Sequence, residues 1–148
     1  MSERLTLHEL DLHLGQTMLT ERGWVILDFE GEPARPLPER RRKRSPLRDV
    51  AGMLRSFAYA VSAAEILRGV VAPDGWEEQA RNHFLAGYLE TIDSGLLPAG
   101  QEAMNRLLQV FELEKAVYEL RYELDNRPEW VRIPVAGIQR LIEEGTPA

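Results

Sequence analysis

The chain has 148 residues, of which 44% are hydrophobic, and it carries a formal net charge of -6 at pH 7. This length and apolar content suit one compact domain with its own core. The acidic balance argues against a general nucleic-acid-binding role, and the lack of cysteine excludes disulfides and thiolate metal sites. No apolar run approaches the roughly 18 residues of a membrane span. No signal peptide is visible, so we expect a soluble cytoplasmic domain without a membrane partner.

Two short apolar segments near the N-terminus predict a β-hairpin. They are Thr17–Leu19 and Trp24–Leu27, and they flank the turn-forming sequence Glu21-Arg22-Gly23. An acidic residue stands outside each segment, because Asp11 precedes the first and Asp28 directly follows the second.

These polar residues follow the order that kinase-type phosphoryl transfer requires. We predict Asp11 as the catalytic residue, since a carboxylate must orient the attacking hydroxyl. Gln16, five positions later, offers an amide oxygen to a metal ion. The hairpin then returns the chain to Asp28, whose carboxylate suits the Mg²⁺ that bridges the nucleotide phosphates. Gln16 and Asp28 are therefore the predicted metal ligands.

Two neighbouring residues have alternative interpretations. His13 contacts the substrate or a phosphate, or it packs beneath the hairpin as an ordinary loop residue. Glu30 is a second metal ligand, directly or through water, or it is a solvated loop carboxylate.

The rest of the chain shows helical periodicity. Ser45 and Pro46 suit the start of a helix that runs to about Arg68, before Gly69. The sequence Asp74-Gly75-Trp76-Glu77 has the spacing of a capping box. Three further helices are predicted, from this box to about Asp93, from about Gln101 to Asn126, and from Pro134 to Gly145. The fold class is therefore mainly α with one small β-hairpin.

The helix predicted over residues 101–126 carries a patch of mixed polarity. An apolar stripe that includes Met104 and Phe111 continues at helical spacing into Lys115, Tyr118 and Tyr122. Aromatic rings stack on the apolar faces of sugars, while Lys and Tyr side chains hydrogen-bond sugar hydroxyls. We predict that this patch contacts a sugar substrate. The alternative is a half-buried helix face with ordinary amphipathic side chains.

A second apolar stripe lies on the opposite side of the same predicted helix. Its members are Leu113, Val117, Leu120 and Leu124. We therefore expect this helix to bury different faces along its length.

Three motifs together resemble a known family of kinases. They are Asp11-Leu12-His13-Leu14-Gly15-Gln16, Asp28-Phe29-Glu30-Gly31-Glu32-Pro33 and Ser45-Pro46-Leu47-Arg48-Asp49-Val50-Ala51-Gly52-Met53-Leu54-Arg55-Ser56. The chain, from about Asp11 onward, is similar to the bacterial maltokinases. These enzymes belong with the aminoglycoside-phosphotransferase-like kinases and are sometimes fused to trehalose synthase. The resemblance implies the fold of a protein-kinase-like C-terminal lobe.

The resemblance also implies a reaction and its cofactors. ATP, with Mg²⁺, would phosphorylate maltose at its anomeric hydroxyl, as part of trehalose and glycogen metabolism. Lys115, Tyr118 and Tyr122 would help to place the maltose. Asp49 would brace the catalytic loop through backbone hydrogen bonds, a role compatible with favourable charge at a helix N-terminus.

The start of the chain affects the expected domain organisation. Only ten residues precede Asp11, whereas related kinases carry the phosphate-covering loop and phosphate-pairing lysine in an upstream lobe. We expect residues 1–148 to form one C-terminal lobe without the ATP-clamping lobe, and to be incomplete as an enzyme alone. Expected partners are a small sugar and a chain that supplies the missing lobe, or a trehalose synthase. The alternatives are a non-catalytic sugar-binding or partner-binding module and a kinase for another small-molecule alcohol, such as an aminoglycoside.

Overall fold

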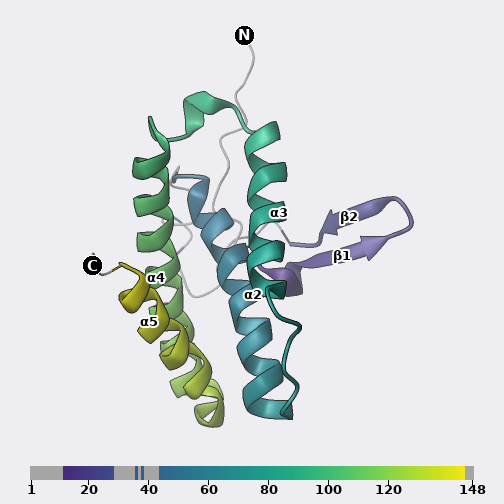
Figure 1. The fold of residues 1–148 in the computed structure, drawn as a ribbon, viewed down its shortest axis with the longest axis vertical. Helices are drawn as coiled ribbons and strands as arrows, with labels where there is room; N and C mark the ends of the chain where they lie inside the picture. Colours follow the sequence, from purple (N-terminus) through teal and green to yellow (C-terminus); the bar gives the residue numbers. More distant parts are fainter. Residues whose placement is uncertain (1–11, 29–35, 37, 39–43, 146–148) are drawn as a thin grey trace.

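The computed structural model describes residues 12–28, 36, 38 and 44–145 of the chain. It shows a helical body from which one two-stranded antiparallel hairpin projects (Figure 1). The elements are η1 Leu14–Gln16, β1 Thr17–Thr20, β2 Gly23–Ile26, α2 Leu47–Arg68, α3 Trp76–Thr91, η2 Ser94–Leu96, α4 Gln101–Asn126, η3 Pro128–Trp130 and α5 Arg132–Gly145. The predicted class, mainly helical with one small hairpin, is confirmed.

α2 is the central helix and packs against α3, α4 and α5. Its apolar core residues recur at helical spacing, and they are Leu47, Val50, Ala51, Leu54 and Ala58. Met104 and Leu108 of α4 complete the main cluster. The helix ends at the predicted place because Gly69 adopts a left-handed φ of 64° and its N–H bonds back to the Glu65 carbonyl.

Among the described residues, one helix, α2, is long and apolar enough to cross a membrane by length and composition alone. The same helix has three others packed around it. Because the core helix of a folded domain passes the same test, this feature does not indicate a membrane span.

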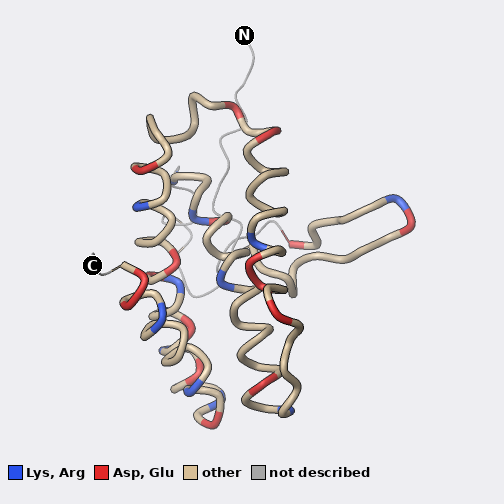
Figure 2. The backbone as a smooth tube through the Cα atoms, viewed as in Figure 1, with Lys and Arg blue, Asp and Glu red and all other residues tan. Residues whose placement is uncertain are grey.

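The buried face of α4 carries carboxylates that pair with α2. Arg55 Nη2 lies 2.6 Å from Glu119 Oε2, and the Tyr59 hydroxyl donates to Glu123 Oε1 at 2.6 Å. Figure 2 shows charged residues of both signs along these helices. The α2–α4 contact is therefore partly ionic, although apolar residues dominate its upper part near the start of both helices.

The second apolar stripe of α4 is not buried along its length. Val117 and Leu124 are both exposed, so the expectation of burial is wrong for these two residues. The physical reason is that α4 packs mainly on α2 and α5, and its buried glutamates face arginine and tyrosine partners.

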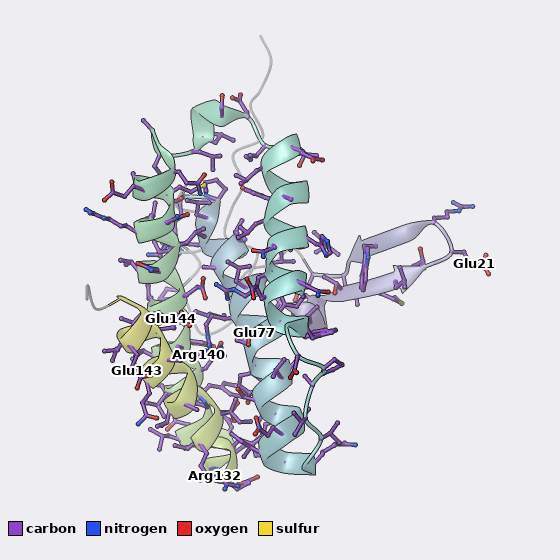
Figure 3. All side chains as sticks on the ribbon, in the orientation of Figure 1. Glu21, Glu77, Arg132, Arg140, Glu143 and Glu144 are labelled. Atoms are coloured by element: carbon purple, nitrogen blue, oxygen red, sulfur yellow. The ribbon has the colours of Figure 1, made fainter. Side chains whose placement is uncertain are left out.

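The start of α3 also differs from the prediction. Gly75 takes the N-cap position with a left-handed φ of 73°, and no side chain caps the helix. Glu77 instead accepts two hydrogen bonds of 3.0 Å from Arg140 of α5 (Figure 3). The predicted capping box is therefore wrong, because a distant arginine binds its glutamate.

The hydrogen bond from Tyr59 to Glu123 makes the free energy of unfolding depend on pH in the alkaline range. Burial, together with the Glu123 carboxylate, raises the pKa of Tyr59. A raised folded-state pKa gives stability that is present below the unfolded pKa, about 10, and is lost as the pH rises further. We expect Tyr59→Phe to lower the free energy of unfolding by about 1–2 kcal/mol near pH 8, and to flatten the loss of stability above about pH 10. Urea unfolding from pH 8 to 12 measures both, and parallel pH profiles for the two proteins would contradict the prediction.

Candidate functional site

The hairpin brings Gln16 and Asp28 together at its base. β1 and β2 pair antiparallel with Thr17 opposite Ile26. The Leu27 N–H donates to the Gln16 carbonyl at 2.9 Å, which extends the pairing beyond the strands. Gln16 Nε2 then lies 3.5 Å from Asp28 Oδ2. The two predicted metal ligands therefore face each other, although their role as ligands stays a prediction.

This pair offers oxygen donors of the kind that Mg²⁺ accepts. A half-turn of the Gln16 amide would present its oxygen, in place of the nitrogen, to an ion beside Asp28. Within residues 12–28 and 44–145, no group of three or more His, Cys, Asp or Glu side chains is placed to hold a metal. An ion here would therefore need further oxygen ligands from water or phosphate. Asp11 and Glu30 lie outside the described residues.

The loop before the hairpin rests on one face of α2. The Leu12 N–H donates to Asp49 Oδ1 at 3.4 Å, and the Leu14 N–H donates to Ser56 Oγ at 2.8 Å. Between these bonds, Gly52 lies so close to the loop that a Cβ would be 2.6 Å from the Leu12 carbonyl oxygen. Asp49 makes a backbone contact of the predicted kind. Ser56 and Gly52 were missed, although their helical spacing from Asp49 is a signal that the sequence contains.

Tyr88 of α3 places a neutral hydroxyl near Asp49. The Tyr88 oxygen is buried and has no hydrogen-bond partner among the described residues. Burial, with a smaller contribution from Asp49, raises the pKa of Tyr88. The phenol therefore keeps its proton at physiological pH, and the loop anchor gains no second negative charge.

His13 uses one ring nitrogen to cap η1. Its Nδ1 accepts a hydrogen bond from the Gly15 N–H at 3.1 Å, and its carbonyl accepts one from the Gln16 N–H at 2.8 Å. In the neutral ring, an accepting Nδ1 places the proton on Nε2. The contact favours the loop interpretation for Nδ1, and Nε2 is the atom by which His13 would reach a substrate.

The predicted sugar-contacting patch lies on α4. Lys115 Nζ lies 4.8 Å from the centroid of the Tyr118 ring, and Arg127 Cζ lies 5.4 Å from that of Tyr122. Tyr122 is 45% exposed, while Lys115 and Tyr118 are half-buried. α4 packs on α2, and the hairpin projects from the opposite side of α2 (Figure 1). The described contacts therefore do not join this patch to the hairpin site, and its role stays a prediction.

A cleft of about 500 Å³ lies between α2, α3 and α5. Two bidentate ion pairs form much of its polar wall. Arg81 binds Glu112 at 2.9 and 2.8 Å. Arg140 binds Glu77 at 3.0 Å (Figure 3). Because these charges neutralise one another, we interpret them as structural contacts between helices.

Two curated relatives share the name glucosamine kinase. One, from Mycolicibacterium smegmatis, is 29% identical over 141 residues, and one, from Streptacidiphilus jiangxiensis, is 27% identical over 137 residues. The matches cover 92% and 90% of this chain but only 34% and 31% of the relatives. The chain therefore spans about a third of their length. No protein-family model matches the chain.

Solved structures of glucosamine kinase contain the same fold. Crystal form A has a TM-score of 0.74 and 26% identity, with 91% of this chain and 32% of that chain covered. A complex with glucosamine, ADP and inorganic phosphate has a TM-score of 0.76 and 27% identity, with 93% and 34% covered. The class that the fold defines is a lobe of a kinase, and the predicted kinase-like lobe is confirmed. Among sugar kinases, the similarity is to glucosamine kinase.

The expected membership of the maltokinases is therefore wrong, since the relatives are named glucosamine kinase. The motifs behind that expectation cover the predicted catalytic loop, the segment after the hairpin that begins with the predicted metal ligand Asp28, and the first half of α2. Phosphoryl transfer depends on positioning and charge at these elements, so the motifs indicate a kind of kinase lobe and not its acceptor. The expected links to maltose, trehalose synthase and glycogen metabolism have no remaining support.

Proposed function

We propose that this chain is the metal-binding and acceptor-binding lobe of an ATP-dependent sugar kinase, with glucosamine or a related amino sugar as the acceptor. The observation that carries the proposal is the Gln16–Asp28 pair, held at 3.5 Å by the hairpin. The pair lies in a lobe whose fold matches a glucosamine kinase structure with a TM-score of 0.76. The names of the relatives support the acceptor class, and the ADP in that structure supports the nucleotide.

In this reaction the lobe acts by positioning. Asp11 would accept a hydrogen bond from the acceptor hydroxyl and orient it toward the γ-phosphate. Gln16 and Asp28 would hold Mg²⁺, which neutralises phosphate charge when it is bound. Tyr118 and Tyr122, with Lys115, would contact the sugar ring and its hydroxyls.

This lobe would be one part of a larger kinase. About two thirds of each relative lies outside the match. The contacts that clamp the nucleotide would therefore come from another region of a complete enzyme or from a partner chain. We propose residues 1–148 as one lobe of such an enzyme, located in the cytoplasm.

Binding by the purified chain tests the proposal. We expect Mn²⁺, a paramagnetic substitute for Mg²⁺, to broaden the amide NMR signals of Gln16 and Leu27 before those of the helices. We also expect glucosamine to shift a localised set of signals, with maltose as the matched control sugar. A folded chain without selective Mn²⁺ broadening would overturn the metal site. An equal response to maltose would overturn the acceptor class.

The exposed hairpin favours a second candidate function, the docking of another polypeptide. Leu19 is 64% exposed and Trp24 is 70% exposed, and the two residues pair across the strands. A two-stranded hairpin is marginally stable by itself, and exposed apolar clusters mark interaction sites. A folded chain that binds neither Mn²⁺ nor glucosamine would favour this non-catalytic module over the kinase lobe.

A further inference from the structure

We propose that Ser56 is a positioning residue for the loop before the hairpin, residues 12–16, which we call the phosphoryl-transfer loop. We also propose that Gly52 provides the space that this positioning needs. The inference rests on the proposed function, because the loop acts in phosphoryl transfer only if that function is correct. Ser56 lies 42 positions from Leu14, whose N–H it accepts at 2.8 Å. This contact crosses from the central helix of the body to the loop that precedes the hairpin.

Three backbone groups of the loop meet three positions on one face of α2. Asp49, Gly52 and Ser56 are spaced by three and four residues, so they lie above one another on the helix. Asp49 meets the Leu12 N–H, Gly52 meets the Leu12 carbonyl, and Ser56 meets the Leu14 N–H. The bond to Ser56, at 2.8 Å, is shorter than the bond of 3.4 Å to Asp49. Ser56 is therefore the tighter of the two hydrogen-bonded anchors.

The anchored amide begins the turn that delivers Gln16. Leu14 is the first residue of η1 and Gln16 is the last, and the Leu14 carbonyl accepts a hydrogen bond from Thr17 Oγ1 at 2.9 Å. A displacement of Leu14 would therefore pass through one tight turn to the Gln16 side chain. One anchor would let the loop pivot, whereas two fix its direction. Ser56 thus determines how Gln16 faces Asp28.

Gly52 allows the loop to approach α2 closely enough for these bonds. A Cβ at this position would lie 2.6 Å from the Leu12 carbonyl oxygen, which is closer than atoms without a hydrogen bond approach. The obstructing atom belongs to the backbone, so a side-chain rotation cannot relieve the overlap.

The hydrogen bond of Ser56 differs from that of an ordinary helical serine. A serine in a helix often bonds to a carbonyl of its own preceding turn. Ser56 Oγ instead accepts a hydrogen bond from the distant Leu14 N–H, which indicates a role in tertiary structure.

Two variants at Ser56 test the inference, with Ser62→Ala on the same helix as the matched control. Ser56→Ala is expected to speed hydrogen exchange of the Leu14 amide about five- to tenfold, the effect of losing one hydrogen bond. It should also weaken Mn²⁺ binding about threefold or more without a matching loss of global stability. Ser56→Thr keeps the hydroxyl and should restore both readouts. Ser62→Ala should change neither.

The possible negative results distinguish the anchor, the positioning role and the proposed function from one another. Unchanged exchange of the Leu14 amide in Ser56→Ala would overturn the anchor. Weaker Mn²⁺ binding that Ser56→Thr does not restore, or that Ser62→Ala reproduces, would overturn the positioning role and indicate general destabilisation. If the unmodified chain does not bind Mn²⁺, the proposed function fails, and with it the positioning role, while the exchange data still decide the anchor.

Discussion

Replacing Arg55 with alanine is expected to lower the free energy of unfolding by about 3–5 kcal/mol. Arg55 is 2% exposed, and its Nη2 lies 2.6 Å from Glu119 Oε2. Its guanidinium also fills the space beside Gly137, where a Cβ would lie 2.7 Å from both terminal nitrogens. The variant would therefore contain a cavity and a buried carboxylate without its cation. Urea unfolding at pH 8 measures the loss.

The pH dependence of this variant should identify the orphaned carboxylate. Burial raises the pKa of Glu119, and Arg55 opposes that rise. Without Arg55 the folded-state pKa should rise further, so the folded state binds a proton more tightly than the unfolded state. The variant then regains stability as the pH falls toward the pKa of Glu in the unfolded state, about 4.3. We expect the destabilisation by Arg55→Ala to be smaller at pH 5.5 than at pH 8.

An exposed ion pair provides the matched control for Arg55. Glu102 and Arg106 pair on the solvent side of α4, where both side chains are largely exposed. Arg106→Ala should change the free energy of unfolding by less than about 0.5 kcal/mol. The Arg55 prediction would be contradicted by an equal effect of both substitutions.

Changing Asp28 to asparagine is expected to weaken Mn²⁺ binding about tenfold or more. Asparagine preserves the size of the side chain and one oxygen that can accept a hydrogen bond from Gln16, so the hairpin should keep its shape. Asp28 is half-buried, so the free energy of unfolding should change by no more than about 1 kcal/mol. Titration of the paramagnetic broadening with Mn²⁺ gives the affinity of both proteins.

Glu21→Gln is the control for this change, because it removes the same charge from the same hairpin. Glu21 is exposed in the turn, away from the helical body (Figure 3). We expect this variant to bind Mn²⁺ as tightly as the unmodified chain. Equal weakening by the two substitutions would show that Mn²⁺ responds to acidic charge in general, against a site at Asp28.

The helix boundaries were predictable where the signals are local. Gly69 ends α2 because a residue without a side chain adopts the left-handed conformation easily. The bounds of α4, Gln101–Asn126, also agree with the prediction. The start of α3 did not, since Glu77 binds Arg140, a residue 63 positions away. Nothing within the local sequence indicates which of two contacts a glutamate makes.

The buried face of α4 was not predicted, because it also depends on contacts between residues that are distant in the sequence. Sequence periodicity locates a core by apolar residues, but Glu112 and Glu123 are buried on this face. Their partners Arg81 and Tyr59 stand 31 and 64 positions away. A carboxylate is tolerated inside a protein only with such partners. Arg127, which also binds Glu123, lies only four positions away, but Arg81 and Tyr59 can be assigned only when the fold is known.

The candidate site was predictable in its arrangement and not in its support. A hairpin between Gln16 and Asp28 brings the two residues together by register alone, and the structure places them in contact. Ser56 and Gly52 share helical spacing with Asp49, but each meets a backbone group of the loop. They were missed because no partner side chain in the sequence points to such a contact. The maltokinase family was a wrong prediction because the motifs describe the transfer of the phosphoryl group and not the acceptor.

The hairpin and the helical body should also differ in how often they open. β1 and β2 pair with each other and project away from the helices (Figure 1), so their amides can exchange through local fluctuations, whereas those of α2 need the whole core to separate. A ligand that bridges Gln16 and Asp28 would join the two ends of the hairpin and oppose its opening. Ligand binding and hairpin formation would then be linked, and the apparent affinity would fall with the fraction of molecules in which the hairpin is open.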